Sequence, residues 1–231
     1  MNYWICKKKF FQQMIEVDRV SVDSLIEMLI DKEVLRFGSF VLNSGRISPY
    51  FFNLGSVDDG QSFRQLGIAY AQKIKEQGLS CDVLFGPAYK GIPIAVSTAI
   101  GLLECGLNVG IAYDRKEKKD HGEGGVLIGA SLQGRVILID DVLTSGKAIR
   151  KSAELIEAAG GSVEAVVIAL DRKEKNESGR SAAMELRDDL GVPVFSLATI
   201  DDVVDFLKTR QEDQFKEIHF AMDQYRAEFC L

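Results

Sequence analysis

The segment VILIDDVLTSGKA, residues 136–148, places two adjacent carboxylates directly after an aliphatic run. Such a run is typical of a strand that is covered on both faces of a parallel sheet, and a strand of this kind carries polar residues only at its ends. We therefore expect Asp140 and Asp141 at a sheet edge. Carboxylates in that position can bind a metal ion or the hydroxyl groups of a sugar.

The small residues Thr144, Ser145 and Gly146 follow the acidic pair and precede a helical pattern. Backbone N–H groups at the start of a helix attract phosphate, so this turn is a candidate anion site. It is not the GxxxxGK loop of nucleoside triphosphatases, because Asp141 stands where that pattern requires glycine. Taken alone, the Asp-Asp dipeptide is equally well explained as a helix cap and a solvated acid. The whole segment predicts a phosphorylated ligand that carries hydroxyl groups.

Two further segments have residue types that suit anions. In FGPAYKGIPIA, residues 85–95, a strand end is followed by a tight loop and a helix, which again offers backbone amides; the alternative is an ordinary turn with a surface lysine. The segment DRKEKKDHGEGG, residues 114–125, contains five cationic or histidine side chains and no large apolar one. A solvated charged face is the commoner explanation of such a run. As a connection, it is expected to be a mobile functional loop or a disordered spacer.

Composition limits the class of protein. The chain has 231 residues, 46% of them hydrophobic, and a formal net charge of −6, which argues against a general nucleic-acid binder. Its four cysteines have no metal-ligand spacing, so a reducing, cytoplasmic location is expected. No apolar run approaches the length of a membrane span. Residues 1–20 are interpreted as an N-terminal extension.

The remaining pattern predicts the elements that must position these residues. We expect a helix over 21–33, short strands in a small separate layer before residue 60, and then strands alternating with helices, which implies an α/β fold with a mainly parallel sheet. The strands are predicted at 81–86, 108–113, 135–140, 162–170 and 192–198, and the helices at 91–104, 146–159 and 180–190. Two helices are expected near the end of the sequence.

Together the motifs resemble those of the type I phosphoribosyltransferases, and VILIDDVLTSGKA is similar to their binding motif for 5-phosphoribosyl 1-diphosphate (PRPP). With SGRISPYFFN (44–53) and ALDR (169–172), the chain resembles in detail the orotate phosphoribosyltransferases of the bacterial dimeric kind. The resemblance implies a Rossmann-like core (about 61–200), a small N-terminal hood (about 21–60) and C-terminal helices (about 200–231) in a single domain.

The resemblance also implies an activity. The family transfers the 5-phosphoribosyl group of PRPP to orotate with Mg²⁺, which gives orotidine 5′-monophosphate and pyrophosphate in pyrimidine biosynthesis. The metal is not held by protein alone, although Asp140 and Asp141 are possible ligands. A homodimer that shares the loop 114–125 between subunits is implied, with no nucleic-acid or membrane partner.

Residue by residue, the resemblance assigns three sets. Catalytic positions are Lys119, His121, Asp140 and Asp141. PRPP-binding positions are Lys90, Arg115, Lys116, Lys119, His121, Asp140, Asp141, Val142, Leu143, Thr144, Ser145, Gly146, Lys147 and Ala148. Orotate-binding positions are Phe51, Phe52, Tyr89, Lys90, Thr144 and Arg172. Two positions depart from the family: Asn43 replaces a frequent lysine, and Lys147 stands where a small residue or threonine is common.

Two other functions share part of the pattern. A purine phosphoribosyltransferase would have the PRPP motif but would not need Arg172 for a carboxylate. A PRPP-sensing regulator or RNA-binding module could retain the fold without turnover. The complete cationic segment and the acidic overall charge favour an enzyme over the second alternative.

Overall fold

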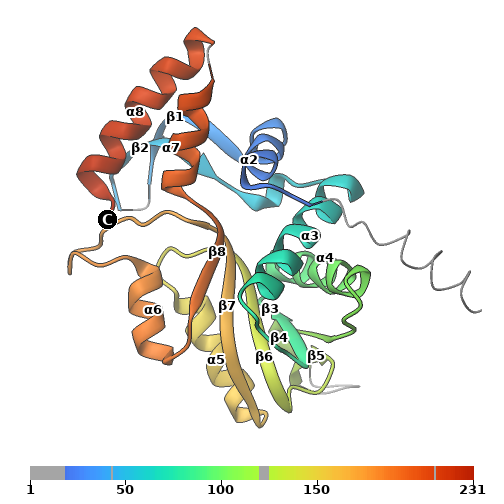
Figure 1. Ribbon diagram of the computed structural model, residues 1–231. Coiled ribbons are helices and arrows are strands. Elements are labelled where there is room, and N and C mark those ends of the chain that lie inside the picture. Colours follow the sequence, from blue (N-terminus) through green and yellow to red (C-terminus); the bar gives the residue numbers. More distant parts are fainter. Residues whose placement is uncertain (1–18, 43, 120–124, 211) are drawn as a thin grey trace, which may run out of the picture.

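A six-stranded sheet forms the centre of the molecule (Figure 1). The computed structural model describes residues 19–42, 44–119, 125–210 and 212–231. The sheet has the order β5-β4-β3-β6-β7-β8, with β5 antiparallel to β4 and every other neighbouring pair parallel. The strands are β3 (Val83–Gly86), β4 (Gly110–Lys119), β5 (Gly125–Gly129), β6 (Gly134–Val142), β7 (Gly161–Asp171) and β8 (Val194–Thr199). This architecture confirms the predicted α/β fold with a mainly parallel sheet.

The central strands are apolar because helices cover both faces of the sheet. In β6, Ile137 and Ile139 pack into one core cluster while Val136 and Leu138 pack into another on the opposite face. Helices α3 (Gly60–Glu76) and α4 (Gly91–Glu104) cover the first face, and α5 (Lys147–Ala158) and α6 (Ala182–Leu190) cover the second. The alternation gives the central strands two buried rows of side chains.

A separate small layer lies beside the sheet. It consists of α2 (Val22–Asp31), the antiparallel hairpin β1 (Leu35–Val41) and β2 (Ile47–Phe52), and the short 3-10 helix η1 (Leu54–Ser56). Helices α7 (Ile200–Thr209) and α8 (Asp213–Phe229) follow β8 directly and contact this layer, α7 against α2 and α8 against β2. Figure 1 shows these elements together at one end of the sheet, where β8 leads into α7.

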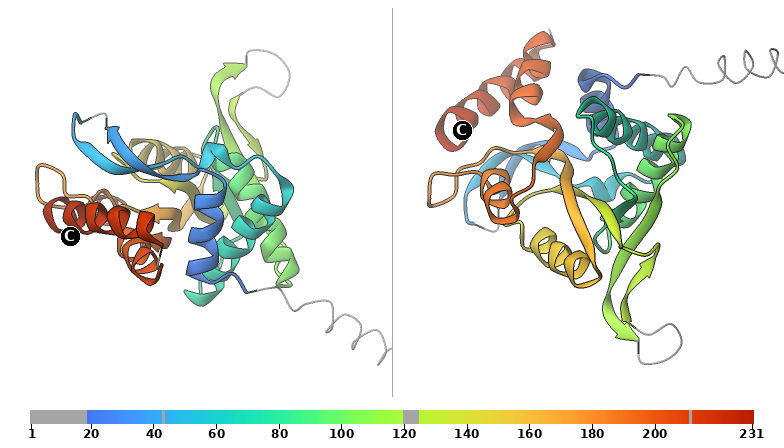
Figure 2. Two further views of the ribbon diagram at one scale, coloured as in Figure 1. Left: turned by 90° about the horizontal axis from the view of Figure 1, so that it is seen from above. Right: turned by 60° about the horizontal axis from the view of Figure 1, so that its bottom comes forward.

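The segment 114–125 was predicted to be an irregular connection, but its first part belongs to strand β4. β4 continues through Lys119 and is antiparallel to β5, with Asp114 opposite Leu127, Lys119 opposite Gly125 and an irregularity in the register between these two pairs. A strand needs no core residues when its partner satisfies the backbone groups and its side chains face solvent. Figure 2 shows this β4–β5 ribbon projecting from the body of the molecule. Residues 120–124, which include His121, lie outside the described residues.

Within the described ranges, none of the helices combines the length and apolarity needed to cross a membrane. The predicted extension, residues 1–20, falls outside the described part except for its last two residues.

Candidate active site

The strand order creates a switch point between β3 and β6. From β3 the chain continues to β4 on one side, whereas β6 pairs with β3 on the other side. In open α/β sheets, ligands bind beyond the carboxyl ends of the strands at such a point, because the neighbouring loops diverge there. The two loops in question are 87–90 after β3 and 143–146 after β6, which are the loops that carry the predicted anion motifs.

The helices that follow these two loops begin without a side-chain cap. Ser21, Asp59, Ser181 and Thr199 cap α2, α3, α6 and α7 by accepting hydrogen bonds from backbone N–H groups. At α4 and α5 the N-cap residues are Lys90 and Gly146, and neither makes such a bond; α8 also begins without one. Uncapped N–H groups at the starts of α4 and α5 are therefore available to anions at the switch point.

An ion pair joins the loop after β3 to the end of β6. The ammonium Nζ of Lys90 donates to Oδ2 of Asp141 at 2.9 Å, and the Asp141 carboxylate is buried. The other oxygen of Asp141 accepts from the backbone N–H of Val142 at 2.8 Å. The structure thus brings together the lysine and the acidic pair that the sequence predicts for one site.

Asp140 is the other half of the acidic pair and is held differently. Burial, reinforced by repulsion from Asp141, raises the pKa of Asp140 to about 7. The Tyr70 hydroxyl donates to the main-chain oxygen of Asp140 at 2.7 Å and fixes the end of β6. Tyr70 was not among the predicted site residues, because nothing in the sequence around it indicates a contact with residue 140, 70 positions away. A carboxyl group that titrates near neutral pH beside a second acid is typical of a functional site.

The turn after the acidic pair is shaped by Gly146. Its φ of +67° is left-handed, and a Cβ at this position would lie 2.9 Å from Nη1 of Arg150. Arg150 in turn donates to the backbone oxygen of Ser145 at 2.6 Å and pairs with Asp189. Arg150 was not predicted as a site residue. The sequence of a helix does not show which of its polar side chains bind the loop that precedes it.

The side chains of the turn divide into a buried and an exposed group. Leu143 is buried, whereas Thr144, Ser145, Lys147 and Ala148 are exposed. Val142 is half-buried at the end of β6. The exposed residues border the uncapped start of α5, as expected for an anion site.

The loop after β3 is tightly built. A Cβ on Gly86 would lie 2.1 Å from the backbone oxygen of Gly91, so glycine is required where β3 meets α4. The backbone N–H of Ala88 donates to the Asp114 carboxylate at 2.7 Å, and the Ala88–Tyr89 peptide bond is cis. Asp114 was not among the predicted site residues, although its position at the start of the charged segment could have suggested a structural role.

The base of the β4–β5 ribbon contacts this loop. Nζ of Lys116 lies 4.7 Å from the centre of the exposed Tyr89 ring. Among the buried side-chain nitrogen and oxygen atoms of the described residues, only Nε of Arg115 has no hydrogen-bond partner. An anionic ligand could accept a hydrogen bond from it. Lys119 ends β4, but its side chain lies outside the described part.

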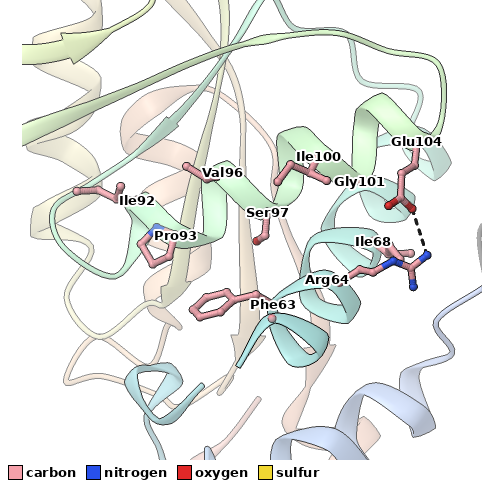
Figure 3. A pocket seen from close by; sticks show the side chains of 11 residues that line it. Phe63, Arg64, Ile68, Ile92, Pro93, Val96, Ser97, Ile100, Gly101 and Glu104 are labelled. Carbon is pink, nitrogen blue, oxygen red and sulfur yellow. Dashed lines mark hydrogen bonds and ion pairs between the residues drawn. The ribbon is translucent and has the colours of Figure 1, made fainter. Parts of the chain in front are cut away.

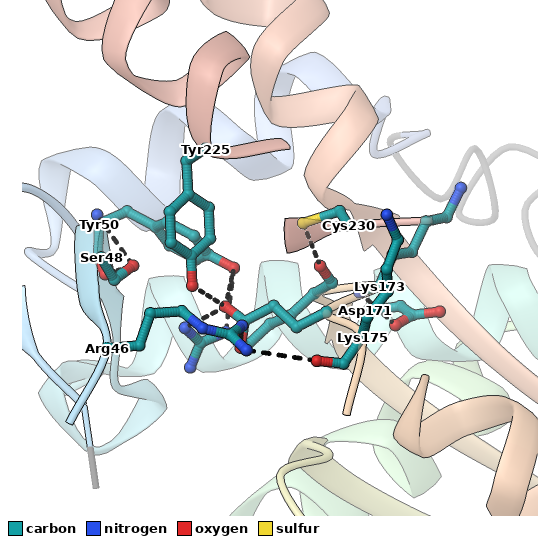
Figure 4. A network of polar contacts seen from close by, with 10 residues as sticks. Arg46, Ser48, Tyr50, Asp171, Lys173, Lys175, Tyr225 and Cys230 are labelled. Atoms are coloured by element: carbon teal, nitrogen blue, oxygen red, sulfur yellow. Dashed lines mark hydrogen bonds and ion pairs between the residues drawn. The ribbon is translucent and has the colours of Figure 1, made fainter. Parts of the chain in front are cut away.

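Arg172, which follows β7, belongs to a polar network, and Figure 4 labels Tyr50 and Tyr225 among its members. Its Nη2 donates to Oε1 of Glu174 at 2.6 Å, and its Nε donates to the Tyr50 hydroxyl at 2.9 Å. Tyr225 of α8 donates to the same Glu174 oxygen at 2.8 Å. Arg172 was predicted from the sequence, but its partners were not, because they come from β2, α8 and the segment after β7.

The predicted aromatic pair is split by the alternation of β2. Phe52 is buried in the core on the same side of the strand as Tyr50, whereas Phe51 is half-buried beside the ring of Phe40 and the guanidinium of Arg36. Because successive side chains of a strand point to opposite faces, the two rings cannot lie on one face of a ligand. Asn43 lies outside the described residues.

The described residues contain no group of three or more His, Cys, Asp or Glu side chains suited to hold a metal ion. Asp140 and Asp141 supply adjacent carboxylate oxygens, which are the donors that Mg²⁺ prefers. Two carboxylates fit an ion that takes most of its ligands from water and a bound substrate, and they do not fit a cage built by protein alone.

Comparison with known proteins places this chain in a family. The phosphoribosyl transferase domain family matches residues 53–196. An orotate phosphoribosyltransferase from Marinobacter nauticus is 50% identical over 81% of this chain and 88% of its own length. One from Chromohalobacter salexigens is 52% identical over 80% of this chain and 82% of its length.

A solved structure agrees with these relatives. The crystal structure of orotate phosphoribosyltransferase from Francisella tularensis superposes with a TM-score of 0.78 at 34% identity, covering 89% of this chain and 98% of the other. The chain therefore belongs to the orotate phosphoribosyltransferases, a family of phosphoribosyl-transferring enzymes.

Proposed function

We propose that the protein transfers the 5-phosphoribosyl group of PRPP to N1 of orotate, which yields orotidine 5′-monophosphate and pyrophosphate in pyrimidine biosynthesis. The observation that carries the proposal is the Lys90–Asp141 pair at 2.9 Å, which links a candidate diphosphate loop to a candidate ribose-binding acid. A ligand with a diphosphate and a phosphorylated sugar spans both uncapped helix starts. Family membership supports the choice of orotate as the acceptor.

The acidic pair is proposed to bind the ribose. Asp140 and Asp141 accept hydrogen bonds from the 2′ and 3′ hydroxyls, and the same carboxylates would be the protein's ligands to Mg²⁺. Cleavage of the C1–O bond places positive charge on the ribose, and nearby carboxylates stabilise that charge by preorganised electrostatics. Mg²⁺, when bound, neutralises part of the diphosphate charge and thereby makes pyrophosphate a better leaving group.

The two helix starts are proposed to hold the phosphates. Backbone amides of 144–148 bind the 5′-phosphate, and the loop 87–90 binds the diphosphate, with Lys90 and Tyr89 beside it. Arg115, Lys116, Lys119 and His121 supply further cationic or donor groups as negative charge develops on the leaving pyrophosphate. Lys119 is the proposed residue that stabilises or protonates the leaving group.

Orotate is proposed to lie between the hood and the end of β7. Arg172 binds its carboxylate, because a planar guanidinium matches a planar carboxylate in two parallel hydrogen bonds. The segment Phe51–Phe52 lies beside the ring, and because side chains alternate along β2 only one of the two rings can face it; Phe52 is on the side of β2 that also carries Tyr50. Thr144 is exposed in the turn after β6 and can reach either the pyrimidine or the phosphate.

We further propose that the enzyme is a cytoplasmic homodimer in which the segment 114–125 serves the partner subunit. The projection of the β4–β5 ribbon from the body supports this arrangement (Figure 2). So does an apolar pocket of about 470 Å³ between α3 and α4, with residues such as Phe63, Val96 and Ile100 in its lining (Figure 3). Ile100 and Leu103 expose 53% and 57% of their surface, and a second copy of the chain would cover them.

The proposal is tested with the purified protein, PRPP and Mg²⁺, by following the absorbance of orotate. Loss of orotate that depends on both PRPP and Mg²⁺ is expected. Turnover of hypoxanthine or adenine instead of orotate would identify a purine enzyme, and tight PRPP binding without turnover of any base would identify a PRPP sensor.

Residues 21–231 are proposed to act as one domain.

A further inference from the structure

Glu174 lies at the centre of a network that joins three parts of the fold. Its Oε1 accepts from Nη2 of Arg172 at 2.6 Å, from the Tyr225 hydroxyl at 2.8 Å and from the Tyr50 hydroxyl at 3.4 Å. Arg46 of the hood approaches the other oxygen at 3.8 Å. The network therefore connects β2, α8 and the segment after β7 through one carboxylate (Figure 4).

The contacts on Arg172 leave one edge of its guanidinium available. Nε and Nη2 form the side edge, and these two atoms bind Tyr50 and Glu174. Nη1 makes no hydrogen bond within the described ranges. The end-on edge, formed by Nη1 and the second N–H of Nη2, can therefore bind a carboxylate in two parallel hydrogen bonds.

The network fixes the direction of that free edge. The Arg172 side chain is only 13% exposed and that of Glu174 19% exposed, so neither is free to reorient in solvent. Burial and the Glu174 carboxylate raise the pKa of Tyr225, and burial raises the pKa of Tyr50, so both phenols remain hydrogen-bond donors near neutral pH. The backbone around Glu174 is also held, because Lys175 N donates to Phe229 O at 2.8 Å and Leu231 N donates to Lys173 O at 3.0 Å.

The charge balance suits an anionic ligand. Two guanidinium groups, Arg46 and Arg172, face one carboxylate, Glu174, so the network retains one positive charge in excess. A carboxylate on the ligand would neutralise this excess without displacing Glu174. A ligand without a carboxylate would leave the excess charge unpaired at a site with little exposure, which is unfavourable.

We propose that Glu174, anchored by Tyr225 and Tyr50, is a positioning residue that aims the end-on edge of Arg172 at the carboxylate of the pyrimidine substrate. This inference rests on the proposed function, since it assumes orotate as the substrate. It assigns α8 a part in substrate selection, although α8 lies outside the sheet and its loops.

Tyr225→Phe tests the anchor, because it removes one hydroxyl and keeps the ring that packs against Tyr50 and Phe229. We expect KM for orotate to rise by about 10-fold, the scale of a lost hydrogen bond to a charged group, while kcat and KM for PRPP stay within about twofold. The inhibition constant of uracil, which lacks the carboxylate, should not change. Met222→Leu, a volume-conserving change at a buried α8 residue one turn earlier, is the matched control and should resemble the wild type.

Glu174→Gln and Glu174→Ala form a second matched pair, because both remove the negative charge but only Gln keeps the acceptor oxygen. A positioning role predicts that Glu174→Gln stays within about threefold of the wild-type KM for orotate, whereas Glu174→Ala exceeds it by about 10-fold or more. Equal values of KM for the two variants would overturn the inference: if both are raised, the charge alone matters, and if both match the wild type, Glu174 has no part in binding orotate.

Other results separate this inference from the function on which it rests. If the wild type consumes orotate but Tyr225→Phe and Met222→Leu both match it, the positioning role is wrong and the proposed function stands. If Tyr225→Phe weakens uracil, orotate and PRPP alike, Tyr225 has a general structural role and the inference is also wrong. If the wild type does not consume orotate, the proposed function itself fails.

Discussion

Replacement of Asp140 by asparagine is expected to stabilise the protein at neutral and alkaline pH while removing a functional group. Asp140 has its pKa raised from 3.8 to about 7 by burial and by repulsion from Asp141. The difference is about three pH units, and each unit corresponds to about 1.36 kcal/mol, so the cost of ionising this group in the folded protein is about 4 kcal/mol. A neutral carboxamide at this position would not carry that cost.

The sign of the pH dependence follows from proton binding. A carboxyl with a higher pKa in the folded protein than in the unfolded chain contributes stability below pH 3.8, and this contribution is lost as the pH rises through about 7. The unfolding free energy of Asp140→Asn relative to wild type should therefore increase by about 4 kcal/mol between pH 4 and pH 8. The difference should become constant about one pH unit below the unfolded-state pKa of 3.8.

Urea denaturation of both proteins at several pH values, without PRPP or Mg²⁺ and at one protein concentration, measures this difference. Asp82→Asn is a suitable control, because Arg135 lowers the pKa of the Asp82 carboxyl to about 2 and the group stays ionised from pH 5 to pH 8. The difference in unfolding free energy between Asp82→Asn and the wild type should therefore not change between pH 5 and pH 8. Curves for Asp140→Asn and wild type that run parallel from pH 4 to pH 8 would refute the reasoning.

Four other predictions concern the proposed chemistry and assembly. Lys119→Ala should lower kcat far more than it raises KM for orotate, because its role is on the leaving group; equal losses would contradict that role. Arg172→Ala should mainly raise KM for orotate, and an unchanged KM would remove Arg172 from the site. Mixing Lys119→Ala with Asp141→Ala protein should restore part of the activity in hybrid dimers if the ribbon acts across subunits, and no recovery would argue against sharing. Ile100→Glu should shift the protein toward monomer in analytical ultracentrifugation, whereas an unchanged sedimentation coefficient would place the interface elsewhere.

Much of the fold follows from local pattern. The helix predicted at 91–104 has the same bounds as α4, and the strand predicted at 135–140 corresponds to β6, which spans 134–142. Both predictions were possible because buried elements show their aliphatic runs and helical spacing directly in the sequence. The segment 114–119 was not predicted as a strand, since its charged side chains carry no period-2 pattern of burial. Pairing with β5 decides its structure, and that is a non-local interaction.

In the site too, residues within local motifs were predicted, and residues brought together from distant parts of the sequence were not. Asp140, Asp141 and Lys90 were predicted because they lie in contiguous motifs at strand ends. Tyr225 and Glu174 were not, since their contact joins residues 51 positions apart in sequence. Strand alternation alone could have separated Phe51 from Phe52, because the two rings of adjacent strand residues face opposite sides.

Some charged residues of the candidate site have an ion-pair partner and one does not, and this difference bears on function. Lys90 and Arg172, the cations expected to meet anionic parts of the substrates, are each held by a carboxylate, Asp141 and Glu174. Asp140 makes no ion pair within the described residues and bears the cost of burial beside another acid. A fold selected for stability alone would replace such a group, so its presence supports the proposed role of Asp140 at the ribose. A positive charge that develops on bound ribose, or a cation that arrives with the substrate, would supply the missing partner.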